Sequence, residues 1–160
     1  MENKIGLTDF KLKQVERDII NLKLKLLDDK FNFNEYIFSF EYLNKLHEFL
    51  FGDIYDNEYI KSRKLSDVEI TFINVLLNHI KIICINNPDN IDDLISSIDE
   101  LWNFQPFYNG NTRTFLGYLS VLNSMFLLNL DIDFDKEIES SFNVFKKENF
   151  VNQKKLTKAK

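Results

Sequence analysis

A chain of 160 residues is long enough to bury a sizeable core, and we expect one domain over residues 1–150. Its 44% hydrophobic content, with 16 Phe but only four Gly and two Pro, favours an all-α fold over a turn-rich β-sandwich. The net charge of −5 argues against a strongly basic nucleic-acid binder. One Cys and two His exclude an internal disulfide and a closed zinc site.

The two ends of the chain give no sign of export or membrane insertion. The first residues lack a charged-then-apolar signal pattern, and no run of 18 apolar residues predicts a membrane span. Residues 151–160 include four lysines and are expected to form a basic, disordered tail. We therefore expect a cytoplasmic protein without membrane contact, with signal-less secretion left open. Heavy use of Asn, Lys, Ile and Phe hints at an A/T-rich bacterial or phage genome.

Periodic apolar positions predict about six helices. The first helix begins at Thr8 or Asp9, since either residue is a competent N-cap. An aromatic connector over residues 31–38 precedes a second helix over about 39–52. The inward positions of the first helix are expected to be Leu12, Val15, Ile19, Leu22 and Leu26. Those of the second are Phe40, Leu43, Leu46 or His47, and Leu50.

The third helix is expected to begin at a capping box formed by Ser66 and Glu69, and a break follows it at residues 86–89. Its buried face is Ile70, Ile73, Leu77, Ile80 and Cys84, with Cys84 as an inert thiol. The fourth helix turns inward Ile91, Leu94 or Ile95, Ile98, and Leu101 or Trp102. A fifth helix is expected over about 111–128 and a last one over 135–147.

The loop before the fifth helix is the most informative stretch of the chain. Half of the prolines fall in it, and Arg113, one of three arginines against 17 lysines, lies in the first turn of the helix. A helix N-terminus attracts anions through its free N–H groups and its dipole, and a guanidinium fork suits phosphate. These residues fit an anion site. They also fit a tight turn between helices, with Asn111 as the N-cap and Arg113 in solvent.

Residues 105–113, QPFYNGNTR, resemble the motif of the Fic (Fido) domain family, His-Pro-Phe-x-(Asp/Glu)-Gly-Asn-(Gly)-Arg-x-x-Arg. The matching residues are Pro106, Phe107, Gly110, Asn111 and Arg113, and Thr112 followed by Thr114 fits a common variant. Weaker similarities over residues 5–9, 46–55 and 130–134 follow in the family's order. The resemblance implies a compact Fic-type helical bundle, with at most a vestigial β-hairpin flap near residues 56–63.

The resemblance also implies a chemistry. In that family the motif histidine deprotonates a hydroxyl of a target protein, the hydroxyl attacks the α-phosphate of ATP, and AMP is transferred. The motif's acidic residue holds Mg²⁺, and the loop binds the phosphates. Carried over by position, the nucleotide-binding residues would be Gly110, Asn111, Thr112 and Arg113, and the cofactors would be ATP and Mg²⁺.

Three positions depart from the motif. Gln105 replaces the histidine, and an amide cannot act as the general base, a contribution typically worth about 10²–10⁴-fold. Asn109 replaces the carboxylate, so it remains a candidate metal ligand that offers only a neutral oxygen. Leu116 replaces the final arginine, and the nearest match to the family's inhibitory pattern, residues 144–149, has a valine in place of the hydroxyl residue. His47 and His79 are expected to be structural.

We therefore expect a catalytically impaired homologue of protein AMP-transferases that binds a nucleotide, another phosphate ligand or a protein partner. One alternative is a nucleotidyl- or phosphoryl-transferase that is still active through altered chemistry. The other is a helical regulatory module, an antitoxin-like partner of an active Fic enzyme.

Overall fold

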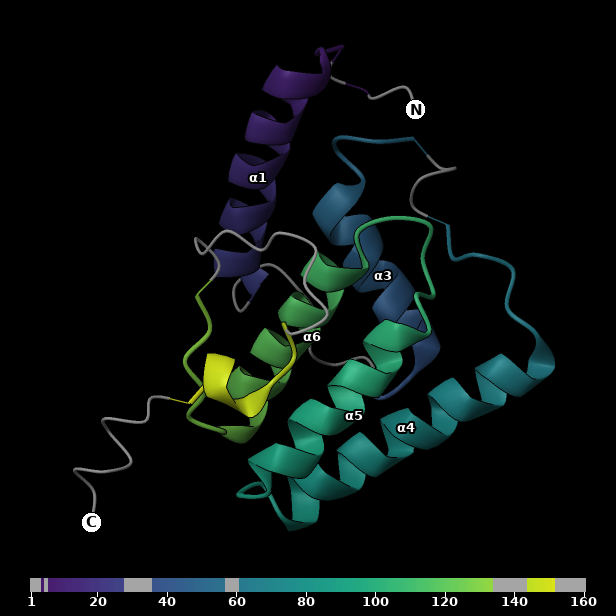
Figure 1. The fold of residues 1–160 in the computed structure, drawn as a ribbon, viewed down its shortest axis with the longest axis vertical. Helices are drawn as coiled ribbons and strands as arrows, with labels where there is room; N and C mark the ends of the chain where they lie inside the picture. Colours follow the sequence, from purple (N-terminus) through teal and green to yellow (C-terminus); the bar gives the residue numbers. More distant parts are fainter. Residues whose placement is uncertain (1–3, 5, 28–35, 57–60, 134–143, 152–160) are drawn as a thin grey trace.

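The computed structural model describes residues 4, 6–27, 36–56, 61–133 and 144–151. Most of these residues are helical, which confirms the predicted all-α class, and the ribbon of Figure 1 shows their arrangement. Within the described ranges the extended pairing is limited to an isolated antiparallel bridge between Ser62 and Phe107. The helices are α1 (Asp9–Lys25), α3 (Phe40–Phe51), α4 (Asp67–Asn86), α5 (Ile91–Asn103) and α6 (Asn111–Phe126), with a 3₁₀ helix η1 (Lys147–Asn149).

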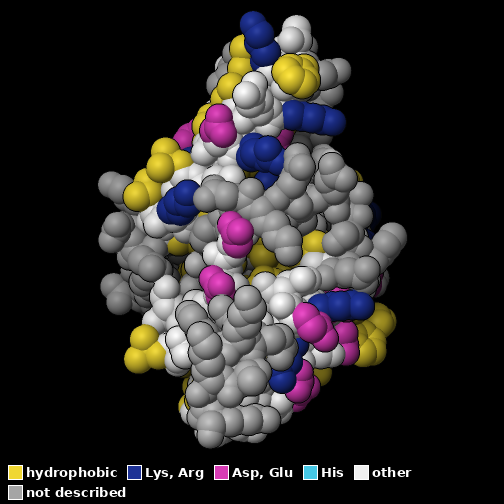
Figure 2. Space-filling view, turned by 60° about the vertical axis from the view of Figure 1, so that its left-hand side comes forward, with side chains coloured by type: hydrophobic (Ala, Val, Ile, Leu, Met, Phe, Trp, Pro, Cys, Tyr) yellow, Lys and Arg dark blue, Asp and Glu magenta, His cyan; other side chains and the backbone are white. Residues whose placement is uncertain are grey.

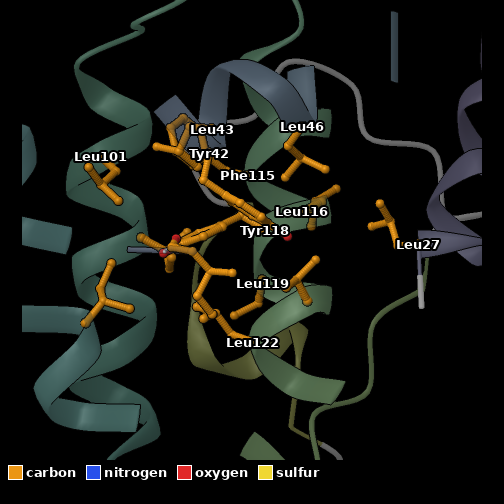
Figure 3. Close-up of a cluster of buried hydrophobic side chains, with 14 of the residues drawn as sticks. Leu27, Tyr42, Leu43, Leu46, Leu101, Phe115, Leu116, Tyr118, Leu119 and Leu122 are labelled. Carbon is orange, nitrogen blue, oxygen red and sulfur yellow. Dashed lines mark hydrogen bonds between the residues drawn. The ribbon is translucent and has the colours of Figure 1, made fainter. Parts of the chain in front are cut away.

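Helix α6 is the centre of the bundle. It packs against α1, α3, α4 and α5, and its side chains from Thr114 to Leu119 are all buried. Figure 3 shows its core-facing residues between Leu101 of α5, Leu46 of α3 and Leu27, which follows α1. Gly117 allows α1 to approach closely, because a Cβ there would lie 3.0 Å from Leu24 Cδ2. The N-terminus of α6 is thereby held beside α1 and α3.

The predicted helix boundaries agree closely with the structure because capping is local. The Ser66 hydroxyl accepts from the N–H of Glu69, and the Glu69 carboxylate accepts from the N–H of Ser66, so the capping box is present. Ser39 caps α3 in the same way through the N–H of Tyr42. Helix α6 ends two residues earlier than expected, because Leu127 adopts a left-handed conformation with φ of 52°.

Two predicted buried faces are wrong in part. In α1 the buried apolar residues are Ile20 and Leu24, followed by Leu27, whereas Leu22 is 58% exposed. Helix α1 has apolar residues on more than one side, and contact with α3 and α6 decides which side is covered. In α4, Ile70 is 38% exposed because it lies at the margin of the face defined by Ile73, Leu77, Ile80 and Cys84.

The last predicted helix, over residues 135–147, is wrong in its described part. Val144 to Lys146 are not helical, and a single 3₁₀ turn follows at η1. The aromatic side chains of Phe145 and Phe150 are buried there, with Phe145 beside Trp102. Residues 31–35, 57–60, 134–143 and 152–160 lie outside the described residues, and with them most of the connector, part of the flap region and the basic tail.

Helix α4 is long enough, and apolar enough over 18 residues, to cross a membrane by length and composition, with 33% of that window buried in the protein. It contains no unbroken run of 18 apolar residues, because Asn74, Asn78 and Lys81 interrupt it.

Candidate anion-binding site

The loop between α5 and α6 turns at Gly110, which has a φ of 78°. A Cβ at this position would lie 2.5 Å from two ring atoms of Phe51 and 3.2 Å from Nε2 of His47. Only glycine fits there, both because an L side chain rarely adopts this φ and because the space is filled by α3. The backbone of the loop is therefore pressed against α3, directly before the first turn of α6.

His47 lies beneath this loop and supports it. Its side chain is fully buried, its ring stacks on Phe107 with centroids 4.2 Å apart, and its Nε2 lies 2.7 Å from the carbonyl oxygen of Asn109. Because a carbonyl can only accept, Nε2 carries the proton of this hydrogen bond. His47 thus holds the loop from behind, in keeping with the structural role expected for it.

Asn111 holds the loop from the other side. Its side-chain oxygen accepts from the N–H of Phe107 (3.0 Å), and its Nδ2 donates to the carbonyl of Phe107 (2.9 Å) and to Oε1 of Gln105 (3.1 Å). The side chain is 5% exposed and all its bonds point back into the loop. Asn111 is the first residue of α6 and Gly110 is the N-cap, so the tight-turn alternative had the wrong capping residue.

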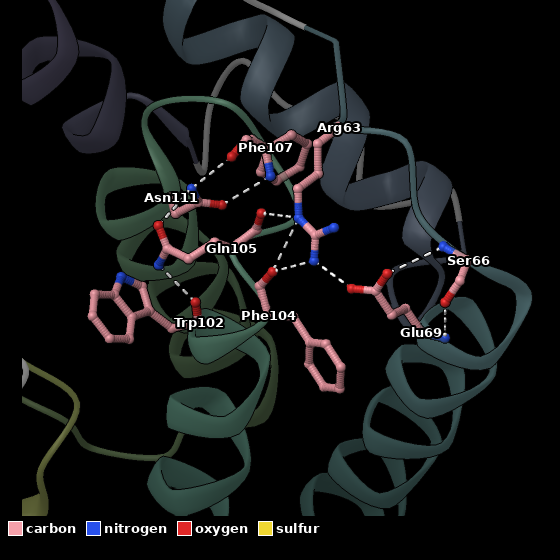
Figure 4. A network of polar contacts seen from close by, with 8 residues as sticks. All are labelled: Arg63, Ser66, Glu69, Trp102, Phe104, Gln105, Phe107 and Asn111. Carbon is pink, nitrogen blue, oxygen red and sulfur yellow. Dashed lines mark hydrogen bonds and ion pairs between the residues drawn. The ribbon is translucent and has the colours of Figure 1, made fainter.

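Gln105, at the position of the motif histidine, is held at both ends of its side chain. Its Nε2 donates to the carbonyl of Trp102 (2.7 Å) while its Oε1 accepts from Asn111. The residue is exposed and has a φ of 47°, a left-handed conformation. Figure 4 shows this chain of contacts from Trp102 through Gln105 to Asn111 and Phe107.

The same network reaches α4 through Arg63, a contribution that the sequence analysis missed. Its guanidinium donates to the carbonyls of Phe104 (2.7 Å) and Gln105 (2.8 Å) and pairs with Glu69 (Figure 4). Arg63 therefore satisfies the carbonyls of the two residues that follow the last residue of α5. The scarcity of arginine in this chain was the one available sequence signal.

Arg113 is half-buried rather than in solvent, which corrects the second part of the tight-turn alternative. Its Nη1 donates to Oδ1 of Asn21 on α1 at 2.5 Å. Burial lowers the pKa of the Arg113 guanidinium, the neighbouring charge of Arg17 lowers it further, and Glu16 acts in the opposite direction. Helix α1 thus places a second arginine, one turn from Asn21, near the first.

The surroundings of Arg113 are basic although the chain is acidic overall. Helix α1 carries five Lys and Arg residues against three acidic ones, in a protein of net charge −5. Figure 2 shows several of these basic side chains over the upper part of the molecule, where α1 lies. Such a local excess of positive charge attracts anions toward that surface.

A shallow pocket of about 300 Å³ opens at the N-terminus of α6. Within it the hydroxyl of Thr112 accepts from Nε1 of Trp102 at 2.9 Å, so its own proton is available to a ligand. Gly110 has no side chain with which to cap the first N–H groups of α6. The lining residues are Gln105, Tyr108, Asn109, Gly110, Asn111, Thr112 and Arg113, and none of them is a carboxylate.

The other candidate residues lie away from this pocket. Leu116 is 2% exposed and belongs to the core. His79 pairs with Asp93 across α4 and α5, and burial raises the pKa of the Cys84 thiol to about 12. Among the described residues, no three His, Cys, Asp or Glu side chains lie together where they could hold a metal ion.

No family model and no curated protein matches this chain.

Proposed function

We propose that this protein is a Fic-type helical domain that binds the phosphate groups of a nucleotide at the N-terminus of α6 and does not transfer AMP. The observation that carries the proposal is the pocket between Gly110, Thr112 and Arg113, where an uncapped helix N-terminus, an oriented hydroxyl and a half-buried guanidinium converge.

Each of these groups suits a phosphate oxygen. The first N–H groups of α6 and the helix dipole favour an anion, and Gly110 leaves the backbone accessible because it has no side chain. Thr112 can donate its hydroxyl proton outward because Trp102 already occupies one of its lone pairs. Arg113 is held in place by Asn21, so little side-chain freedom is lost when it binds a ligand.

The loss of catalysis follows from the groups around Gln105. An amide has no basic lone pair near neutral pH, and both ends of this amide are already engaged. His47 is the histidine nearest in the described structure to the loop backbone, but it is buried and its Nε2 is committed to Asn109. His79 is paired with Asp93. Neither imidazole faces a hydroxyl that would enter the pocket.

The pocket does not fit a resident Mg²⁺ ion. Mg²⁺ is usually held by one or two carboxylates together with substrate phosphates, and Asn109 offers a neutral amide oxygen instead. We therefore derive no step through a metal, and the proposal needs phosphate recognition by the protein's own N–H, hydroxyl and guanidinium groups alone.

The binding test is isothermal titration calorimetry with ATP, ADP and inorganic phosphate. The wild-type protein should bind, and Arg113→Ala should abolish binding. Arg17→Ala removes one exposed charge and should weaken binding by up to about fivefold. Lys11→Ala is the matched control, because it removes one exposed positive charge from another side of α1. Absence of heat with all three ligands, in folded wild-type protein, would sink the proposal.

The catalytic half is tested by the double reversion Gln105→His, Asn109→Glu, incubated with labelled ATP. Wild-type protein should stay unlabelled, and the double variant should gain self-labelling if only the base and the carboxylate have been lost. Labelling of wild-type protein, or of proteins in a lysate by it, would contradict the loss of AMP transfer.

A further inference from the structure

Helix α4 has a second apolar face, which points away from the core. Its inner face contains Ile73, Leu77 and Ile80, all buried. On the outer face the exposed fractions are 64% for Val68, 56% for Phe72, 59% for Val75, 49% for Ile82 and 55% for Ile85. Figure 1 shows α5 along one side of α4 and no other described helix along the opposite side. We call the five exposed residues the outer stripe.

The spacing of the outer stripe is that of a helix–helix contact. Val68, Phe72, Val75, His79 and Ile82 follow at alternating intervals of four and three, the repeat that keeps one seam facing a partner helix. The 20 residues of α4 form a rod about 30 Å long, and the stripe runs along most of it. A surface helix of a globular protein normally has only one apolar face.

We propose that the outer stripe is the interface of a two-fold symmetric dimer, in which α4 packs antiparallel against α4 of a second copy. This inference is independent of nucleotide binding at α6.

The stripe is complementary to itself in that arrangement. With the two-fold axis between Asn78 and His79, Val75 lies opposite Ile82 of the other copy. Ile85 flanks this seam, because it lies about 140° around the helix from Phe72. The polar pair at the axis would meet its own symmetry mate, and a polar residue within an otherwise apolar seam specifies the register. The pairing closes, so it gives a dimer and not a filament.

The charges at the two ends of α4 also fit a second copy. Lys61 and Lys64 precede the helix, and Asp89 follows it. In the antiparallel pair each basic end lies beside an acidic end, and the helix dipoles oppose each other favourably. Other charges at these ends have partners within the chain: Arg63 with Glu69, Asp92 with Lys147, Asp93 with His79, and Lys81 over the ring of Tyr36. Asp67 adds one further negative charge in the first turn.

The area is sufficient for a stable contact. The outer stripe exposes roughly 500 Å² of apolar surface, near the upper end for the largest patch of a typical monomer. With the polar side chains beside it, two copies would bury on the order of 1,200 Å² in total, the lower bound for a specific interface.

A membrane fits the same face less well. Asn78 and His79 interrupt the stripe at its centre, whereas a membrane-surface helix carries Lys and Arg along its polar face. The chain as a whole is acidic, with a net charge of −5, which disfavours anionic lipid. The inner face of α4 is also part of the core, so a crossing would break the bundle.

The test is sedimentation velocity of the full chain between about 1 and 200 µM, a range that covers weak and tight dimers. Wild-type protein should associate, and Val75→Asp and Ile82→Asp should each weaken association at least tenfold. Asn74→Asp is the matched control, with the same added charge at an exposed position of α4 beside the stripe, and it should leave association unchanged. Circular dichroism confirms that each variant is folded.

Cross-linking tests the register. Asn78→Cys should form a disulfide-linked dimer under mild oxidation, because residue 78 lies at the axis. Asn74→Cys should form no such dimer. The native Cys84 is buried and should stay unreacted in both variants. Wild-type protein that is monomeric at the highest concentration overturns the proposal, as does a dimer indifferent to Val75→Asp. If the protein is monomeric and co-sediments with phosphatidylcholine–phosphatidylserine vesicles, and Val75→Asp abolishes this co-sedimentation, the outer stripe binds a membrane instead.

Discussion

Replacing Gly110 by alanine should destabilise the protein far more than the same replacement at Gly6. Both glycines have a positive φ, 78° at Gly110 and 63° at Gly6, so an added Cβ costs about 1–2 kcal/mol at either position. At Gly110 the Cβ would also lie 2.5 Å from the ring of Phe51, whereas at Gly6 nothing lies within 4 Å. Overpacking of this kind adds about 1–3 kcal/mol.

The expected loss is therefore roughly 2–5 kcal/mol for Gly110→Ala against about 1–2 kcal/mol for Gly6→Ala. Urea unfolding followed by circular dichroism measures both, and the midpoint should move by about 1–3 M for Gly110→Ala at an ordinary urea dependence. The loss of roughly 2–5 kcal/mol is a large fraction of the 5–15 kcal/mol by which a natural domain is typically stable. The variant should therefore also unfold at a clearly lower temperature.

A double-mutant cycle separates the clash from the backbone strain. Phe51→Leu removes the ring atoms that the new Cβ would meet. The double variant should therefore lose less free energy of unfolding than the two single variants together, by about 1–2 kcal/mol. If Gly110→Ala proved as mild as Gly6→Ala, or if the cycle were additive, the close packing of the loop on α3 would be refuted.

Two further predictions concern Arg63 and Cys84. Arg63→Lys should cost about 1–3 kcal/mol of stability, because a lysine cannot donate at once to the carbonyls of Phe104 and Gln105 and to Glu69. Thermal unfolding measures this loss, and Lys64→Arg, the control at the next residue, should be neutral in it. Burial raises the pKa of the Cys84 thiol to about 12, from its ordinary value of 9.0 in an unfolded chain. Stability should therefore be lost as pH rises through this window, by up to about 1.4 kcal/mol per pH unit. Cys84→Ala should flatten that slope in urea melts, and an unchanged slope would contradict the burial of the thiol.

The sequence by itself determined the local features of this protein. The capping box at Ser66, the start of a helix near Ser39 and the break after Asn86 were predicted correctly, because each depends on a few adjacent residues and their backbone hydrogen bonds. The all-α class followed from periodicity for the same reason. The loop before α6 stood out through its rare residue types, Pro106, Gly110 and Arg113.

Only the tertiary structure decided which faces and which partners these elements use. Contact with α3 and α6 buries Ile20 and Leu24 of α1 and leaves Leu22 in solvent, a choice among apolar sides that periodicity cannot make. The bond of Arg113 to Asn21 joins residues 92 positions apart, and the support of the loop by His47 joins residues 62 apart. Such pairings depend on how helices pack, which is a property of the whole chain. The same packing leaves the second apolar face of α4 uncovered within one chain.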